Sequence, residues 1–152
     1  MRVAFAADHA GAALKAELIR RIAGVLPEDL LIDLGGDGSD PLDDYPDFAL
    51  ALGRSIQDGI AERGILICGS GQGMVIAANK ISGAYAALCW LPEQGRAVRE
   101  HNGANIICLP GDTIQVETAA AIIDNWLAAE PKAGDYARRR MLIERLEQGE
   151  AI

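Results

Sequence analysis

Two kinds of segment alternate along this chain, and their hydrophobic patterns differ. One kind is a short apolar run that lacks the every-second-residue polarity of a half-exposed strand. These runs lie at Val3–Ala7, Leu30–Leu34, Gly64–Cys68, Ala84–Trp90 and Ile106–Leu109. Parallel strands that are covered on both faces have this pattern. The pattern therefore predicts five buried parallel strands.

The segments between these runs carry apolar residues at helical spacing. Three such stripes consist of Leu14, Leu18, Ile22 and Val25; of Phe48, Leu52, Ile56 and Ile60; and of Val116, Ala120, Ile123 and Leu127. Pro46 suits the first turn of the second helix. A last amphipathic helix is predicted over residues 136–147, with Leu142, Ile143 and Leu146 on one face.

The alternation of strands and helices predicts an α/β protein. We expect a single domain over residues 1–152, built as a Rossmann-like three-layer sandwich. In this arrangement an open parallel sheet of about five strands carries helices on both faces. The longest irregular segment, residues 35–44, follows the second predicted strand, where α/β proteins usually place functional loops.

Composition narrows the classes of partner. The chain has 152 residues, 50% of them hydrophobic, and 14 Lys and Arg against 22 Asp and Glu give a net charge of −8. Such a surface repels phosphate backbones and anionic lipids, so we expect neither a nucleic-acid nor a membrane partner. The chain begins directly with a strand pattern, and its three cysteines lie in apolar runs. We therefore expect a cytoplasmic protein with reduced thiols.

A glycine-rich turn follows the third predicted strand. Gly69, Gly71 and Gly73 come directly after Cys68 and open a short helix. Glycines let successive backbone N–H groups converge on an anion. The spacing is GxGxG, so it matches neither the dinucleotide fingerprint GxGxxG nor the P-loop. On the glycines alone, an anion site and a ligand-free strand-to-helix turn are equally good interpretations.

Cys68 adds chemistry to this turn. N–H donors around its sulfur should favour the thiolate, which can act as a base or a nucleophile. The alternative is a small buried hydrophobic residue, and that is the better interpretation of Cys89 and Cys108. With only His9 and His101 and no CxxC or HExxH motif, the sequence offers little from which to build a zinc site.

Three other segments carry polar groups that could serve a site. Asp8 and His9 follow the first strand and should share the sheet edge of Cys68, although Asp8 could simply cap the next helix. Tyr45, at the start of the second helix, could offer its hydroxyl to a substrate. His101 precedes the fifth strand and should lie at the opposite edge. It is therefore unrelated to Cys68, or it reaches the site of a second subunit.

In this order and spacing, these segments resemble the type B ribose-5-phosphate isomerase family, which includes the galactose-6-phosphate isomerase subunits. The matching strings are AADHAG (6–11), DYPDFA (44–49), GILICGSGQGM (64–74), IAANK (76–80) and REHNGANI (99–106). The resemblance covers about residues 2–128. It implies a metal-free aldose–ketose isomerase that needs no cofactor. It also implies a homodimer, or a dimer of dimers, with active sites shared between subunits.

The resemblance also implies roles for individual residues. Cys68 would move the proton between C1 and C2, and His101 would open the furanose ring. The loop that holds the enediolate oxygens would consist of Gly69, Ser70, Gly71 and Gly73. The contacts to substrate hydroxyls would come from Asp8, Tyr45 and Asn102. His9 would contact the phosphate of a sugar phosphate, and Met74 replaces the glutamate that some members use as the base.

The chain departs from the family pattern at three places. Gly103 replaces an aspartate, and Asp112 and Asp135 stand where phosphate-binding arginines are expected. A carboxylate repels a phosphate dianion, whereas an arginine binds it. Within the run of arginines at 138–140, Arg139 shares a helix face with Leu142 and Ile143. We therefore expect Arg139 to point toward packed structure and to bind the phosphate. An equally good interpretation is that all three arginines are solvated or pair with Glu144 and Glu147.

These observations leave three hypotheses. The first is an aldose–ketose isomerase of ribose 5-phosphate or a related sugar phosphate, with a different or an unphosphorylated sugar as the alternative substrate. The second is a non-catalytic module that binds a sugar or a nucleotide on the same sheet. The third is a nicotinamide-dependent oxidoreductase, which rests on fold class alone and lacks the required third glycine.

Overall fold

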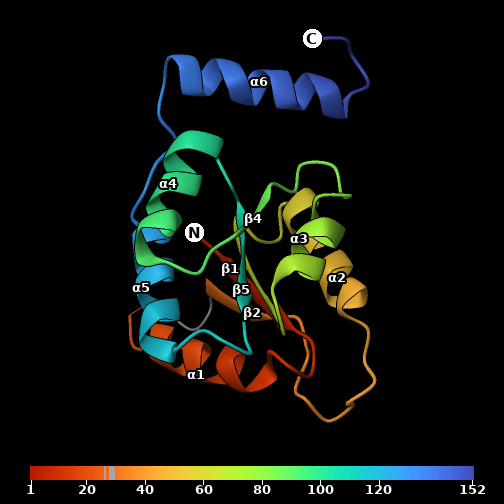
Figure 1. Cartoon of the computed structure of the whole chain (residues 1–152), viewed down its shortest axis with the longest axis vertical. Helices are drawn as coiled ribbons and strands as arrows, with labels where there is room; N and C mark the ends of the chain where they lie inside the picture. The colour runs from red at the N-terminus through yellow and green to blue at the C-terminus, as the bar shows by residue number, and fades with distance from the viewer. Residues whose placement is uncertain (26, 28–29) are drawn as a thin grey trace.

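The computed structural model describes residues 1–25, 27 and 30–152, in which strands and helices alternate (Figure 1). The strands are β1 (Val3–Ala7), β2 (Leu31–Asp33), β3 (Arg63–Cys68), β4 (Ala86–Leu88) and β5 (Ile106–Pro110). The helices are α1 (Ala12–Ile22), α2 (Tyr45–Gln57), α3 (Gln72–Ala78), α4 (Pro92–Asn102), α5 (Val116–Leu127) and α6 (Asp135–Glu147).

All strand pairs are parallel, and the order across the sheet is β2-β1-β3-β5-β4. Every residue of the three central strands is buried, whereas the edge strands β2 and β4 are partly exposed. The continuous apolar runs of β1, β3 and β5 follow from this burial, because both sheet faces are covered. The predicted Rossmann-like α/β architecture is confirmed.

Each face of the sheet has its own hydrophobic core. On one face Phe5, Ile65 and Ile107 pack with α1, α4 and α5, and Trp126 of α5 is fully buried there. On the other face Leu66 and its neighbours pack with α2 and α3. Each fully buried large side chain of this kind contributes roughly 1.5–3 kcal/mol. The two cores hold the strand ends, and therefore the loops that follow them, in fixed positions.

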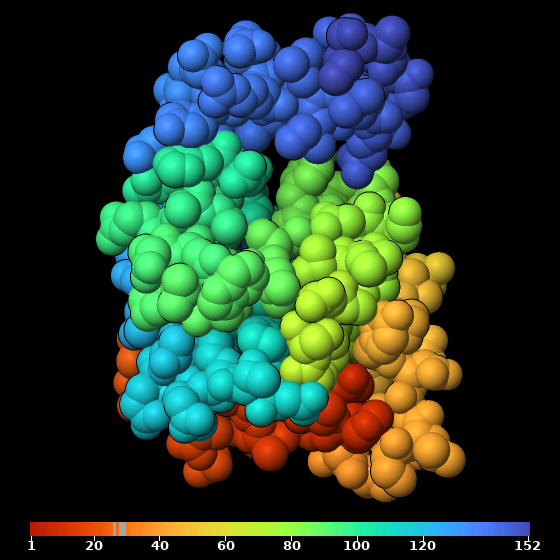
Figure 2. Space-filling view, viewed as in Figure 1, coloured from red at the N-terminus to blue at the C-terminus, as the bar shows by residue number. Residues whose placement is uncertain are grey.

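Helix α6 lies outside these layers. It crosses the end of the sheet at which the strands begin and contacts α4 (Figure 1), and it forms a separate ridge on the surface (Figure 2). All its residues are partly or fully exposed, including Ile143 and Leu146. The expectation that Arg139 points toward packed structure is therefore wrong for the single chain: Arg139 is exposed, because the apolar face of α6 has little to pack against.

The structure also corrects the extent of two helices and adds one. The sequence pattern extends the apolar stripes of α1 and α2 to Val25 and Ile60. In the structure these two residues lie beyond the helix ends and are 82% and 50% exposed. Helix α4 has no predicted counterpart. Its sequence PEQGRAVREHN has few apolar residues, so it lacks the stripe that marked the other helices.

Candidate functional site

The candidate site lies where neighbouring strands send their connections in opposite directions. β1 and β3 are adjacent, but the chain leaves β1 toward β2 on one side and leaves β3 toward β4 on the other. Ligands of open α/β sheets bind at such a switch point, outside the carboxyl ends of the strands. Asp8 and His9 follow β1, and Cys68 is the last residue of β3. The structure thus brings these three residues to one place.

Cys68 is almost covered by its own subunit, with 4% of its surface exposed. It packs in the hydrophobic core between the sheet and helices α2 and α3. This core also includes the fully buried Met74. The loop after β5 holds the backbone at Cys68 and Gly69 through two hydrogen bonds. The Gly111 N–H donates to the Cys68 carbonyl oxygen at 2.8 Å, and the Asp112 N–H donates to the Gly69 carbonyl oxygen at 3.0 Å. The sulfur therefore has a fixed position at the foot of the glycine loop.

All three cysteines are free thiols, but they differ in surroundings. Cys89 and Cys108 are fully buried. Burial raises the pKa of the Cys89 thiol to about 12 and raises the pKa of the Cys108 thiol well above its usual range. These two residues remain neutral, as small hydrophobic core residues do.

Each glycine of the loop allows a close contact. Gly71 has φ +74°, and a Cβ there would lie 2.5 Å from Leu88. A Cβ at Gly69 would lie 2.8 Å from an Asp112 carboxylate oxygen, and one at Gly73 would lie 2.7 Å from the Tyr45 ring. The glycines thus let Asp112 and Tyr45 approach the backbone from two sides. Ser70 is exposed and borders a cavity of about 630 Å³ that also includes Trp90 and Thr118.

Asp8 is the buried carboxylate of the site, with 6% of its surface exposed. Its backbone N–H donates to the Ile67 carbonyl oxygen at 3.1 Å, so Asp8 lies beside the end of β3. Burial raises the pKa of Asp8, although a hydrogen bond from the Gly11 N–H at 3.0 Å opposes part of this effect. The carboxylate therefore serves as the Gly11 acceptor, while the Asp8 backbone is bound to the strand that ends at Cys68.

His9 has a partner that the sequence did not reveal. Its Nδ1 lies 2.6 Å from Asp43 Oδ1, and its backbone N–H donates to the same oxygen at 3.0 Å. This hydrogen bond raises the pKa of His9, with Asp8 and Asp40 adding to the effect. Asp43 belongs to the loop after β2, and Tyr45 in the same segment contacts Gly73. The segment 43–45 therefore spans from His9 to the glycine loop.

His101 and Asn102 lie at the other end of the sheet, as the sequence predicted. They end α4, and β5 begins four residues after Asn102. Because Ile106 pairs with Gly64 and Pro110 with Cys68, the start of β5 is about 13 Å from Cys68 along the strands. The structure of one chain therefore does not bring His101 and Asn102 to the other candidate residues.

Around His101 the chain assembles a second cluster, in which several basic side chains gather and Lys132 is paired with Glu100 at 2.5 Å. Tyr136 of α6 stacks on the His101 ring, with centroids 4.5 Å apart and planes 8° apart. Arg139 and Lys132 each lie 6.0 Å from the Tyr136 ring. Arg140 is half-buried and donates to the Lys132 carbonyl oxygen at 2.8 Å. Of the three consecutive arginines, Arg140 and not Arg139 is the one that packs into the body.

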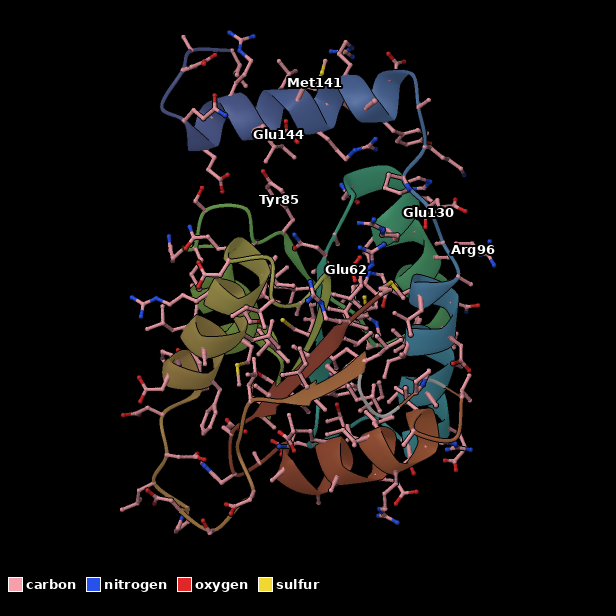
Figure 3. The ribbon with its side chains drawn as sticks, turned by 180° about the vertical axis from the view of Figure 1, so that it is seen from behind. Glu62, Tyr85, Arg96, Glu130, Met141 and Glu144 are labelled. Atoms are coloured by element: carbon pink, nitrogen blue, oxygen red, sulfur yellow. The ribbon has the colours of Figure 1, made fainter. Side chains whose placement is uncertain are left out.

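A small cavity of about 140 Å³ separates α6 from the body beside this cluster. Tyr85 and Glu144 face each other across it (Figure 3), and Asn102 and Arg140 line it as well. Gly103 makes room for Arg140, since a Cβ there would lie 2.7 Å from Arg140 Cδ. The departure from aspartate at position 103 is thus coupled to the position of this arginine.

The two aspartates that stand in place of the expected arginines lie at different ends of the sheet. Asp112 is exposed and lies against Gly69, within the Cys68 cluster. Asp135 begins α6 and pairs with Arg138 at 3.5 Å. The roles of Asp43, Tyr136 and Arg140 were missed because each depends on a contact between distant segments. The sequence carries no local signal for such a contact.

Comparison with known proteins identifies the family. The family model for ribose/galactose isomerases matches residues 3–143. The chain belongs to the ribose/galactose isomerase family. Ribose-5-phosphate isomerase B of Escherichia coli is 35% identical over 147 residues, which cover 97% of each chain. The resemblance inferred from the five sequence strings is therefore confirmed.

Solved structures of the family have the same fold. A ribose-5-phosphate isomerase B from Clostridium thermocellum superposes with a TM-score of 0.90 at 38% identity, covering 98% of this chain and 99% of that one. The Mycoplasma genitalium enzyme, solved with bound ribulose-5-phosphate, gives 0.88 at 34% identity and covers 97% and 96%.

Across residues 1–25, 27 and 30–152, no three His, Cys, Asp or Glu side chains are grouped as ligands for a metal ion. Of the helices described, none combines the length and apolar content that crossing a bilayer requires.

Proposed function

We propose that this member of the ribose/galactose isomerase family interconverts ribose 5-phosphate and ribulose 5-phosphate, with Cys68 as the base. One observation carries the proposal: the Cys68 sulfur is held at the foot of a glycine loop at the switch point of the sheet. Relatives that align along almost the whole chain are ribose-5-phosphate isomerases B, and one of them was solved with ribulose-5-phosphate.

The reaction is a proton transfer between neighbouring carbons. The Cys68 thiolate takes the proton from C2 of the open-chain aldose, and the C2–H electron pair forms the C1–C2 double bond of a cis-enediolate. The carbonyl oxygen gains the negative charge, and a proton moves from the C2 hydroxyl to the C1 oxygen. The Cys68 thiol then returns its proton to C1, which yields the ketose. No net oxidant or reductant is consumed, because both carbons belong to the same sugar.

The glycine loop supports the charged intermediate. In the proposed reaction, backbone N–H groups of Gly69, Ser70, Gly71 and Gly73, which follow Cys68 in the chain, would bind the enediolate oxygens as they develop charge. Preorganised donors of this kind stabilise such charge strongly, and the loss of one costs about 10²–10³-fold in rate. Asp8 and Tyr45 would bind substrate hydroxyls beside the loop.

Two copies of the chain would complete each site. The cluster around Cys68 carries Asp8, Asp43 and Asp112, whereas the cluster around His101 carries arginines and Lys132, with Lys132 paired to Glu100. A second copy that places its His101 cluster opposite Cys68 would supply the ring-opening imidazole and Asn102. Its Arg139, exposed on α6, would then supply positive charge for the phosphate. The cytoplasm supplies the reducing conditions in which Cys68 stays a thiol.

Activity assays test the base. Purified wild-type protein should convert ribose 5-phosphate to ribulose 5-phosphate, and Cys68→Ala should lower kcat by about 10²–10⁴-fold. Cys89→Ala is the matched control, since it removes a thiol from the core and should leave kcat within a few-fold. Equal activity of Cys68→Ala and wild type would refute the proposal. A panel of aldoses with and without phosphate determines whether Asp112 has shifted the preferred sugar.

Mixing two inactive variants tests the shared site. Cys68→Ala and His101→Ala each disable both sites of a homodimer. In a 1:1 mixture that exchanges subunits, the mixed dimer recovers one intact site, so about one quarter of wild-type activity should return. Light scattering should show a dimer or a tetramer. A fully active monomer, or mixtures that stay inactive despite subunit exchange, would contradict a shared site.

A further inference from the structure

The strongest unassigned feature beside the site is the contact between His9 and Asp43. The two residues are 34 positions apart and belong to different loops, the one after β1 and the one after β2. Asp43 Oδ1 accepts twice from the same residue, from the His9 backbone N–H at 3.0 Å and from the ring Nδ1 at 2.6 Å. Two bonds to one oxygen fix both the backbone and the ring of His9.

This geometry determines what the ring can offer. With Nδ1–H donated to Asp43, Nε2 is the remaining ring nitrogen, and it has no hydrogen-bond partner among the residues described. Nε2 accepts in the neutral imidazole and becomes a donor, Nε2–H, when the ring is protonated. The two side chains also differ in exposure: 40% of the His9 side chain faces solvent, against 13% for Asp43. The carboxylate is thus the covered partner of the pair, and the ring is the partner that solvent reaches.

The charges around His9 indicate what the His9–Asp43 pair could bind. The described groups that face His9 are carboxylates, namely Asp43 in contact and Asp8 and Asp40 nearby. Asp112 adds a further carboxylate on the far side of the glycine loop. Among the described groups that act on His9 none is positive, so His9 itself is the group that can offer positive charge to a phosphate dianion there. An arginine would carry its charge at every pH, whereas an imidazole needs a partner to keep it at neutral pH.

We propose that Asp43 is a positioning residue for His9: it orients the imidazole with Nε2–H toward the substrate and holds it as the cation that this half of the site presents to the phosphate group. The proposal rests on the proposed function for the identity of the phosphate ester. Asp43 does not touch substrate in it. The raised pKa of His9, caused first by the Asp43 hydrogen bond, agrees with this role.

The pH dependence follows from the sign of this effect. Because Asp43 raises the pKa of His9, the imidazolium persists to higher pH than in an isolated histidine. KM for the phosphorylated sugar should stay low below that pKa and rise as pH passes through it. Asp43→Asn keeps an oxygen acceptor but removes the charge, so the rise in KM should move to lower pH.

The test compares Asp43→Asn with Asp37→Asn, which removes one carboxylate from the same loop without a contact to His9. At pH 7.5, Asp43→Asn should raise KM for ribose 5-phosphate and Ki for inorganic phosphate about tenfold, the effect of one charge-assisted contact. Its kcat should change less than twofold. Asp37→Asn should resemble wild type. A fall in kcat with unchanged KM and Ki would overturn the proposal.

NMR provides a readout that does not need activity. The chain has two histidines, so His9→Gln assigns both ring signals. In wild type the His9 signal should titrate above the ordinary value of about 6.5 and shift when inorganic phosphate is added. In Asp43→Asn its pKa should fall. If wild-type His9 titrates at or below the ordinary value, or ignores phosphate, the proposal is wrong, even where the isomerase assay succeeds. An inactive wild type would refute the proposed function and leave this titration decisive for Asp43.

Discussion

At the scale of single residues, the site contains a group whose burial lowers the stability of the fold. Asp8 is a carboxylate with 6% exposure, next to the apolar end of β3. Burial of a charge opposes folding, and such residues are retained where chemistry needs them. Met74, by contrast, fills the position of an alternative base as an ordinary fully buried side chain.

Asp8→Asn should therefore separate stability from activity. A carboxyl whose pKa is raised by folding binds its proton more tightly in the folded state, so its contribution to stability falls as pH rises through that pKa. Asparagine copies the neutral form and keeps the acceptor for Gly11. We expect a larger free energy of unfolding than wild type at pH 7, no difference near pH 3, and a loss of activity of at least about 10²-fold.

Urea denaturation at the two pH values measures the first effect. Asp124→Asn, which removes an exposed carboxylate of α5, is the control and should change stability little at either pH. A variant at position 8 that is less stable than wild type at pH 7 would show that the charged form makes a favourable contact.

The three thiols should react in a fixed order. Cys68 keeps a small exposed surface, whereas Cys89 and Cys108 are fully buried and their raised pKa values keep them protonated. A small alkylating reagent at pH 7.5 should modify Cys68 first and abolish activity in parallel. Mass spectrometry of the labelled peptides checks the order. Labelling of Cys108 before Cys68 would contradict it.

At the scale of elements, the strands were predicted well because burial dictates their composition. The runs at β1, β3 and β5 are apolar since both sheet faces are covered, and the edges β2 and β4 are shorter than their sequence runs because they are half-exposed. Helix α4 was missed because its stability comes from packing on α5 and not from an apolar stripe.

The site shows the same division. Cys68, Asp8 and His9 could be placed together from the sequence, because each follows a strand whose carboxyl end lies at a known edge. Asp43 and Tyr136 could not, because their positions depend on how long segments return to the sheet. The exposure of Arg139 on α6 could not be predicted either. An amphipathic pattern predicts which helix face packs only if a surface is present to cover that face.

A pair of glycine variants should separate backbone strain from steric overlap. Gly71 and Gly83 have similar φ angles, +74° and +79°, but only Gly71 has close neighbours. Gly83→Ala should cost about 1–2 kcal/mol from the left-handed backbone alone. Gly71→Ala should cost more and reduce activity, because its Cβ would lie 2.5 Å from Leu88 and move the loop above Cys68. Thermal unfolding measures both, and equal losses would contradict a steric role.

At the scale of the whole molecule, α6 gives the chain an uneven surface. A helix that keeps Met141, Ile143 and Leu146 between 43% and 56% exposed does not stabilise the fold through its own apolar residues. It does carry Tyr136 and Arg140 to the His101 cluster. Its placement is therefore consistent with an assembly in which a second copy covers this face.

Leu146→Asp should weaken that assembly. Placing a charge in a covered apolar contact typically costs a few kcal/mol, enough to shift a dimer toward monomer at micromolar concentration. Val25→Asp, a similar change at a residue 82% exposed and distant from α6, is the control. Light scattering over a dilution series measures both. If the two variants dissociate alike or neither does, α6 is not the contact.

Side-chain hydrogen bonds hold the loop between β2 and α2 at both of its ends, and the tip between these ends is exposed. At its start the buried Lys15 donates to Asp33 at 2.5 Å and to the Gly35 carbonyl oxygen at 2.8 Å, and at its end Asp43 holds His9. Residues 37–42 stand in solvent. Because the entropy of a loop grows slowly with length, extra residues at this tip would cost little and leave both anchors in register. Related chains are therefore free to vary the length of this tip while both anchored ends keep their positions.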